Sequence, residues 1–67
     1  MEKEYIRDFY GKIIGSVETD NKGNQTLRNF HGRILGYYDK QNNVTRDFYK
    51  KIVGRGNILT SLLYKGK

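Results

Sequence analysis

The sequence predicts an all-β protein, an antiparallel meander of about six strands built from three internal hairpin repeats in one domain of 67 residues. Three observations predict this class: a nine-residue segment occurs three times, alanine is absent, and glycine is frequent. Phenylalanine, isoleucine, valine, tyrosine and threonine fill the periodic positions, and these residues favour strands. Because alanine is the strongest helix former and glycine weakens helices, a helical repeat is disfavoured.

The repeat is the main feature of the chain. RDFYGKIIG begins at Arg7, RNFHGRILG begins at Arg28 and RDFYKKIVG begins at Arg46, at offsets of 21 and 18 residues. All three copies share the arginine, the phenylalanine, the pair of branched apolar residues and the closing glycine. Self-similarity of this kind indicates one supersecondary unit used several times. The chain therefore divides into repeats of about 5–26, 27–45 and 46–56 and a C-terminal tail of 57–67.

Each copy is expected to form a strand, a tight turn and a second strand. In the first copy the turn is expected at Tyr10-Gly11-Lys12, because a glycine there accepts the positive φ that short hairpins need. Between the copies, residues 20–24 and 39–43 are rich in Asn and Asp and are typical of turns. Three copies joined by two such turns give six strands.

The tail departs from the repeat. Ile58, Leu59, Leu62 and Leu63 have helical spacing, and Asn57 stands where a helix N-cap is expected. The sequence therefore predicts a short C-terminal helix over residues 57–65, with a seventh strand as the alternative.

Alternation along the strands assigns side chains to two faces of the sheet. One face is expected to form the core or a contact between copies of the chain. Its members are Phe9, Ile13, Phe30, Ile34, Phe48 and Ile52. Gly15, Gly36 and Gly54 lie between them, and we expect these glycines to let phenylalanine rings of neighbouring strands lie flat over the backbone.

The opposite face mixes aromatic and basic residues and is the candidate ligand or interaction face. Its members are Tyr10, Lys12, His31, Arg33, Tyr49 and Lys51. Phosphates need positive charge and bases stack on aromatic rings, so this pattern suits nucleic acid. The alternative is structural: the tyrosines cover the hairpin ends, and the stems of the lysines and arginines lie over them.

The repeated arginines have two interpretations as well. Arg7, Arg28 and Arg46 could form a row for nucleic acid, but cross-strand pairing with Glu18, Asp39 or a neighbouring aspartate is favoured. Such pairs help to fix the register of the strands and contribute little stability each.

Composition limits how so small a domain is stabilised. The chain has 13 Lys and Arg against 7 Asp and Glu, a net charge of +6, one histidine and no cysteine. Disulfides and thiolate metal sites are therefore excluded, and we expect neither a metal nor a cofactor. Because a single sheet with apolar residues on both faces cannot cover them alone, we expect a homo-oligomer, with a monomeric barrel-like roll as the alternative.

Catalysis is not expected. His31 occupies a position that Tyr10 and Tyr49 hold in the other copies, and no nucleophile-elbow or phosphate-loop motif occurs. The predicted function is a non-enzymatic, self-associating structural or protein-interaction module, and the alternative is a nucleic-acid-binding protein that uses the tyrosine, lysine and arginine face. No apolar run approaches the ~20 residues of a membrane span, so no membrane partner and a cytoplasmic location are expected.

Two resemblances accompany the repeat. Residues 38–45, which read YDKQNNVT, resemble the strand–turn–strand unit of bacterial YD (Rhs-type) repeats. Residues 5–64 resemble a group of short bacterial proteins, mainly from Firmicutes, that carry repeated RDFYGRILG segments. The second resemblance implies a repeat organisation and a bacterial source, and it implies no activity.

Overall fold

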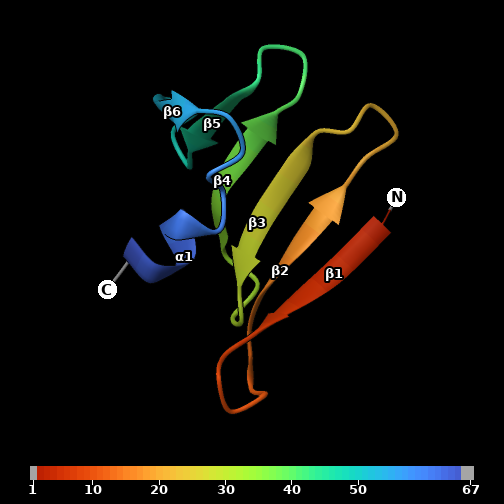
Figure 1. Cartoon of the computed structure of the whole chain (residues 1–67), viewed down its shortest axis with the longest axis vertical. Helices are drawn as coiled ribbons and strands as arrows, with labels where there is room; N and C mark the ends of the chain where they lie inside the picture. Colours follow the sequence, from red (N-terminus) through yellow and green to blue (C-terminus); the bar gives the residue numbers. More distant parts are fainter. Residues whose placement is uncertain (1, 66–67) are drawn as a thin grey trace.

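The computed structural model describes the backbone of residues 2–65 and the side chains of residues 2–63. One antiparallel sheet contains all six strands in chain order, which confirms the predicted all-β meander (Figure 1). The strands are β1 (Glu2–Arg7), β2 (Ile13–Thr19), β3 (Gln25–Asn29), β4 (Ile34–Asp39), β5 (Val44–Asp47) and β6 (Ile52–Arg55). A five-residue helix, α1 (Ser61–Lys65), follows the sheet. Within residues 2–65, β1 and β6 do not pair, so the sheet is open.

The hairpins alternate between the two ends of the sheet. Because each strand pairs with the next, the turns after β1, β3 and β5 share one end, and the turns after β2 and β4 share the other. We call the first the repeat end and define it by the turn residues 8–12, 29–33 and 47–51 together with the arginine that precedes each turn. The sheet twists strongly between β1 and β6, as twisted antiparallel sheets do (Figure 1).

The strand register shifts at equivalent places in the three hairpins that close at the repeat end. Ile6 pairs with Gly15 while Arg7 pairs with Ile13, so one extra residue lies between the two pairs in β2. The same shift occurs beside Arg28 in β3 and beside Arg46 in β5. Such bulges increase the local twist and bend the strand that carries the extra residue.

Three glycines form the surface on which the C-terminal segment packs. A Cβ on Gly15 would lie 2.7 Å from the carbonyl oxygen of Arg28 and 3.1 Å from Leu63 Cδ1. A Cβ on Gly54 would lie 2.5 Å from Ile58 Cδ1. The expected structural role of these glycines is therefore correct, but the expected partner is wrong: side chains of the tail approach them, and phenylalanine rings do not.

Gly36 is the most crowded of the three glycines. A Cβ there would lie 2.6 Å from the carbonyl oxygen of Arg46 and would also meet Leu62. Leu59, which follows Ile58 in the tail, is buried beside Gly36 with 1% of its surface exposed. The tail therefore covers one face of the sheet over β4, close to its centre (Figure 1).

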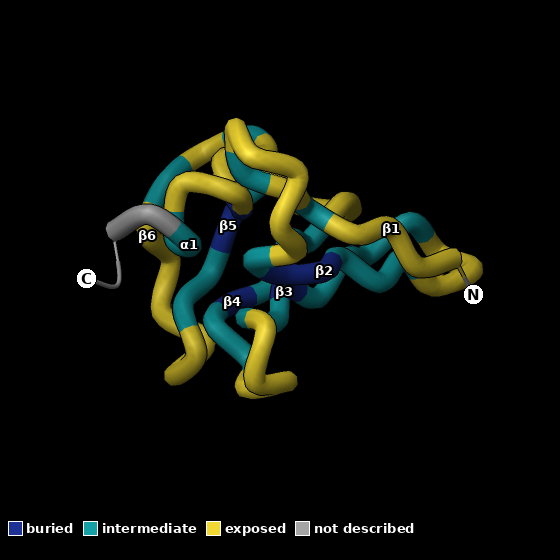
Figure 2. Tube along the Cα trace, turned by 90° about the horizontal axis from the view of Figure 1, so that it is seen from below, coloured by how far each residue is buried: buried dark blue, intermediate teal, exposed yellow. Residues whose placement is uncertain are grey.

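The core is small. Among the described residues, Leu27 and Leu59 are the buried hydrophobic side chains, and the buried stretches lie along the middle strands (Figure 2). The fully buried Thr45 joins the tail to the sheet: its hydroxyl donates to the carbonyl oxygen of Gly56 at 2.7 Å and accepts from the backbone N–H of Ile58 at 3.1 Å. Because the hydroxyl both donates and accepts a hydrogen bond, it can be buried without an unpaired polar atom.

The expected core face is wrong as a core within the chain. Phe9, Phe30 and Phe48 are 95%, 63% and 53% exposed, because they lie in turns, where the alternation of a strand does not apply. Ile13 and Ile52 are also exposed, and Ile34 is half-buried. As a contact between copies of the chain, this face stays a prediction.

The predicted short helix is present as α1, and the described part of the tail forms no seventh strand. The proposed N-cap is wrong, because the helix begins at Ser61 and Asn57 lies four residues earlier. Asn57 Oδ1 instead accepts from the backbone N–H of Leu59 at 3.3 Å in a turn that precedes the helix. Within residues 2–65, no helix is long and apolar enough to cross a membrane.

Candidate binding surface at the repeat end

The first turn of the repeat end is closed by four hydrogen bonds centred on Asp8. The Asp8 N–H donates to the carbonyl oxygen of Lys12 at 2.9 Å, and the Gly11 N–H donates to the carbonyl oxygen of Asp8 at 3.0 Å. Asp8 Oδ1 accepts from the backbone N–H groups of Tyr10 and Lys12, each at 2.9 Å. Gly11 has φ +82°, the left-handed conformation that completes this kind of hairpin loop.

The other two turns repeat this arrangement. In the second turn, Asn29 Oδ1 accepts from the backbone N–H groups of His31 and Arg33. An amide oxygen is therefore the acceptor here in place of a carboxylate oxygen. Asp47 Oδ1 accepts from Tyr49 and Lys51 in the third turn. The short polar side chain that begins each turn therefore fixes its shape.

The left-handed position is conserved in geometry but not in residue type. Gly32 has φ +84°, and Lys50 takes the same place in the third turn with φ +67°. A residue with a side chain is strained in this conformation, and the third copy differs from the other two in having Lys50 where they have glycine. Its Nζ lies over the Tyr37 ring, 5.7 Å from the ring centroid, on the face of the sheet away from the tail.

Each arginine that precedes a turn reaches across it. The Nη1 atoms of Arg7, Arg28 and Arg46 donate to the carbonyl oxygens of the left-handed residues at 3.0, 2.9 and 3.1 Å. Arg28 Nε also donates to Glu18 Oε1 at 3.0 Å, and Arg46 Nη2 lies 3.9 Å from Asp39 Oδ2. The expected pairing of the arginines with Glu18 and Asp39 is therefore confirmed for two of the three.

The two central residues of every turn present a pair of rings to solvent. The Phe9 and Tyr10 ring centroids lie 5.5 Å apart at an interplanar angle of 83°. The third turn is similar, with 5.3 Å and 77° between Phe48 and Tyr49. Tyr10 and Tyr49 are 88% and 84% exposed, so neither ring is covered by the chain itself.

The middle turn differs in its ring geometry. Phe30 and His31 lie 3.9 Å apart at an interplanar angle of 38°, which is closer to stacking than to an edge contact. Both residues are exposed. The repeat end therefore carries three exposed ring pairs, one on each turn.

Positive charge concentrates at the same end. The basic residues of the three turns and their preceding arginines are Arg7, Lys12, Arg28, Arg33, Arg46, Lys50 and Lys51. The acidic residues there are Asp8 and Asp47, and both use one carboxylate oxygen to hold backbone N–H groups. The remaining five carboxylates of the chain lie in β1, in β2 and at the opposite turns. Two of these five, Glu18 and Asp39, contact Arg28 and Arg46, so the excess positive charge of the repeat end comes from its other basic residues.

The structure brings the six residues of the predicted ligand face together, but at turns and not across a sheet face. Tyr10, His31 and Tyr49 lie inside the turns, and a basic residue closes each turn two positions later. The sequence interpretation left Phe9, Phe30 and Phe48 out of this surface. The signal that could have placed them is an Asp or Asn three residues before the left-handed position, which indicates a turn that contains the phenylalanine.

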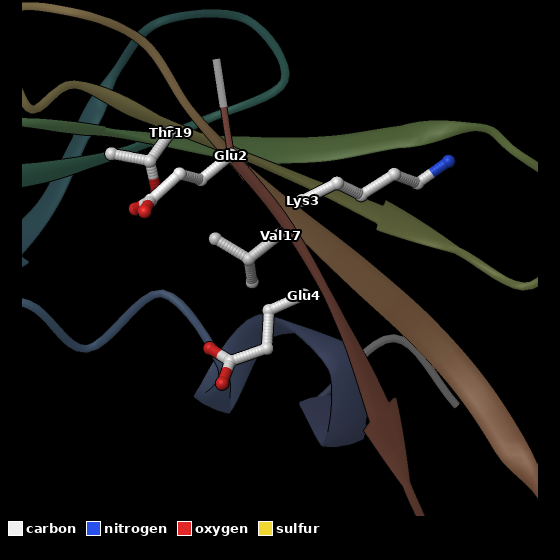
Figure 3. Close-up of a pocket in the computed structure, with 5 residues that line it drawn as sticks. All are labelled: Glu2, Lys3, Glu4, Val17 and Thr19. Carbon is white, nitrogen blue, oxygen red and sulfur yellow. The ribbon is translucent and has the colours of Figure 1, made fainter.

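A hollow lies away from the repeat end, between β1 and β2. Glu2, Lys3, Glu4, Val17 and Thr19 line it, and Figure 3 shows the two carboxylates on one side of β1 and Lys3 on the other. The described residues contain no group of three His, Cys, Asp or Glu side chains that could hold a metal ion.

Comparison with models of protein families, with curated proteins and with solved structures found no match to the chain.

Proposed function

We propose that the chain is a non-enzymatic interaction module that binds an anionic partner through the repeat end. The observation that carries the proposal is the coincidence of three exposed ring pairs with seven basic residues at one end of one sheet. Exposed aromatic rings are favourable contact area for a partner, and concentrated positive charge selects a partner of opposite sign. The proposal includes a cytoplasmic location, the compartment that the sequence predicts.

Catalysis is not part of the proposal. His31 is exposed in a turn, contacts the Phe30 ring at a tilt and has tyrosines in the equivalent positions of the other turns. General acid–base chemistry needs titratable groups that converge on a substrate. A contact role suits this position better, because all three equivalent residues are flat, exposed rings.

Binding of heparin, used as a polyanion without bases, tests the proposal. We expect the affinity to fall steeply between about 50 and about 200 mM salt, because bound cations are released from the polyanion. The triple variant Lys12→Gln, Arg33→Gln, Lys51→Gln should weaken binding about ten-fold or more. The matched control is Lys22→Gln, Lys40→Gln, Arg55→Gln, which removes three charges from the opposite end and should change affinity far less. Equal losses in the two variants would overturn the assignment to the repeat end.

Self-association is a second candidate, favoured by the exposed apolar residues of the sheet face away from the tail. Tyr5, Ile13 and Ile52 are exposed, and no described element covers this face. Light scattering should then give a multiple of 7.9 kDa. Because burial of apolar side chains would drive this association, salt should weaken it far less than it weakens anion binding. A single-copy mass at all salt concentrations would exclude this candidate.

A further inference from the structure

We propose that the ligand of the repeat end is a single-stranded nucleic acid, whose bases stack on the ring pairs while its phosphates lie beside the basic residues. This inference rests on the proposed binding of an anionic partner and names its chemical class. It adds one requirement that charge alone does not impose, namely that the rings themselves contribute to affinity.

The rings are placed for stacking. Phe9 is 95% exposed and meets Tyr10 at 83°, so the pair presents one ring face and one ring edge. A partner that carries only charge, such as a sulfated sugar or an acidic peptide, gains little from such faces. A base offers a flat π surface of matching size, and stacking of this kind is tolerant of base identity.

The spacing of the turns favours a single strand. Successive ring pairs lie on alternate hairpins, so two strand spacings, roughly 10 Å in an untwisted sheet, separate neighbouring turns. Bases stacked in a duplex are only about 3.4 Å apart along a strand, and their faces are covered by their neighbours. Rings at three separated turns can therefore reach base faces only where the strand is unpaired and its bases are splayed.

The basic residues lie where phosphates of such a strand would pass. Lys12, Arg33 and Lys51 lie two positions after the second ring of each pair and are exposed. The arginines before the turns are held in place by their bonds to the turn carbonyls, so part of the positive charge is already ordered before binding. Ordering of this kind lowers the entropy cost of binding.

Base selectivity is expected to be weak. Asp8, Asn29 and Asp47 use their Oδ1 atoms to hold backbone N–H groups, and the basic side chains of the turns are the ones assigned to phosphates. Sequence is read by hydrogen bonds to base edges, and stacking supplies little of it. Oligothymidine and oligoadenosine should therefore bind within a few-fold of each other.

Fluorescence anisotropy with a labelled oligothymidine single strand tests the inference, with heparin as the ligand control. The variant Phe9→Leu, Phe30→Leu, Phe48→Leu keeps charge and apolar bulk but removes three ring faces. We expect it to lose about ten-fold or more in affinity for the oligonucleotide, because removal of even one stacking ring typically costs about that much. Heparin affinity should stay within two-fold, roughly, because heparin offers no base to stack. An unchanged circular dichroism spectrum shows that the variant is folded.

The outcomes separate this inference from the proposed function. If the variant binds oligonucleotide and heparin as the native chain does, the rings do not stack and the inference fails, while anion binding stands. Duplex binding as tight as single-strand binding would also overturn it, as would binding to phosphatidylglycerol vesicles but not to the oligonucleotide. If the native chain binds neither heparin nor the oligonucleotide, the proposed function itself is wrong.

Discussion

Arg28 Nη1 donates to the carbonyl oxygen of Gly32 at 2.9 Å, directly across the turn that holds Phe30 and His31. The bond joins the last residues of β3 to the left-handed residue of the turn, and its equivalents occur in the other two turns of the repeat end. Phe30 and His31 lie between the two bonded residues and outside both strands. The repeat therefore holds aromatic rings in solvent, where a partner can reach them.

The side chain that begins each turn should contribute measurably to stability. Asp8→Ala removes the acceptor for the backbone N–H groups of Tyr10 and Lys12, and we expect a loss of about 1 kcal/mol in the free energy of unfolding. Asp8→Asn should change it by only a few tenths, roughly, because Asn29 performs the same role in the second turn. Urea unfolding measures both variants, and equal losses in the two would contradict the role given to the acceptor oxygen.

The glycines under the tail should differ in their tolerance of a methyl group. A Cβ on Gly36 meets the backbone carbonyl of Arg46 as well as Leu62, so Gly36→Ala should cost about 2 kcal/mol or more. In Gly54→Ala the close neighbour is the flexible end of Ile58, which can move, and the cost should stay near 1 kcal/mol, roughly. Thermal unfolding ranks the two, and a larger loss at Gly54 would show that the tail does not lie as described.

The buried hydroxyl of Thr45 should matter more than its methyl group. Thr45→Val leaves the carbonyl oxygen of Gly56 and the N–H of Ile58 without their partner, and we expect a loss of about 2–3 kcal/mol. Thr45→Ser keeps the hydroxyl and should lose about 1 kcal/mol. Denaturant unfolding of the pair tests this order, which would be reversed if the site were held by apolar packing alone.

The stabilising contribution of Asp39, at the turn between β4 and β5, should be lost in acid. Hydrogen bonds from Asn42 lower the pKa of Asp39, with a smaller contribution from the Arg46 charge. A carboxyl group with a lowered pKa in the folded state stabilises it above the unfolded-state pKa, and this contribution is lost as the pH falls through the folded-state pKa. Asn42→Ala should therefore raise the pKa of Asp39 toward its ordinary value. Carbon-13 NMR titration of the carboxyl measures the shift, and an unchanged pKa would contradict the assigned cause.

Local sequence signals predicted the strands and turns because they act over a few residues. The glycine after the ring pair predicted a left-handed position, and Gly11 and Gly32 occupy it. The error was to extend strand alternation into the turn, which placed Phe9 and its equivalents in a core. Asp8 and Asn29 indicate the true start of each turn, which lies two residues before the start that we expected at Tyr10 or His31.

The packing of the tail could not be predicted in the same way. Both partners were visible in the sequence, the repeated glycines and the apolar residues from Ile58 onward. What the sequence did not show was that they meet, because Gly15 and Leu63 are far apart along the chain and no local pattern links them. The buried hydroxyl of Thr45 was missed for the same reason.

The central claim is that the repeat end is the binding surface, and an NMR titration of the nitrogen-15-labelled native chain with an oligothymidine single strand tests it most directly. We predict that the largest shift changes fall on the backbone N–H groups of Tyr10, His31 and Tyr49, in all three turns together. Changes confined to the turns after β2 and β4, or no saturable change at all, would contradict it.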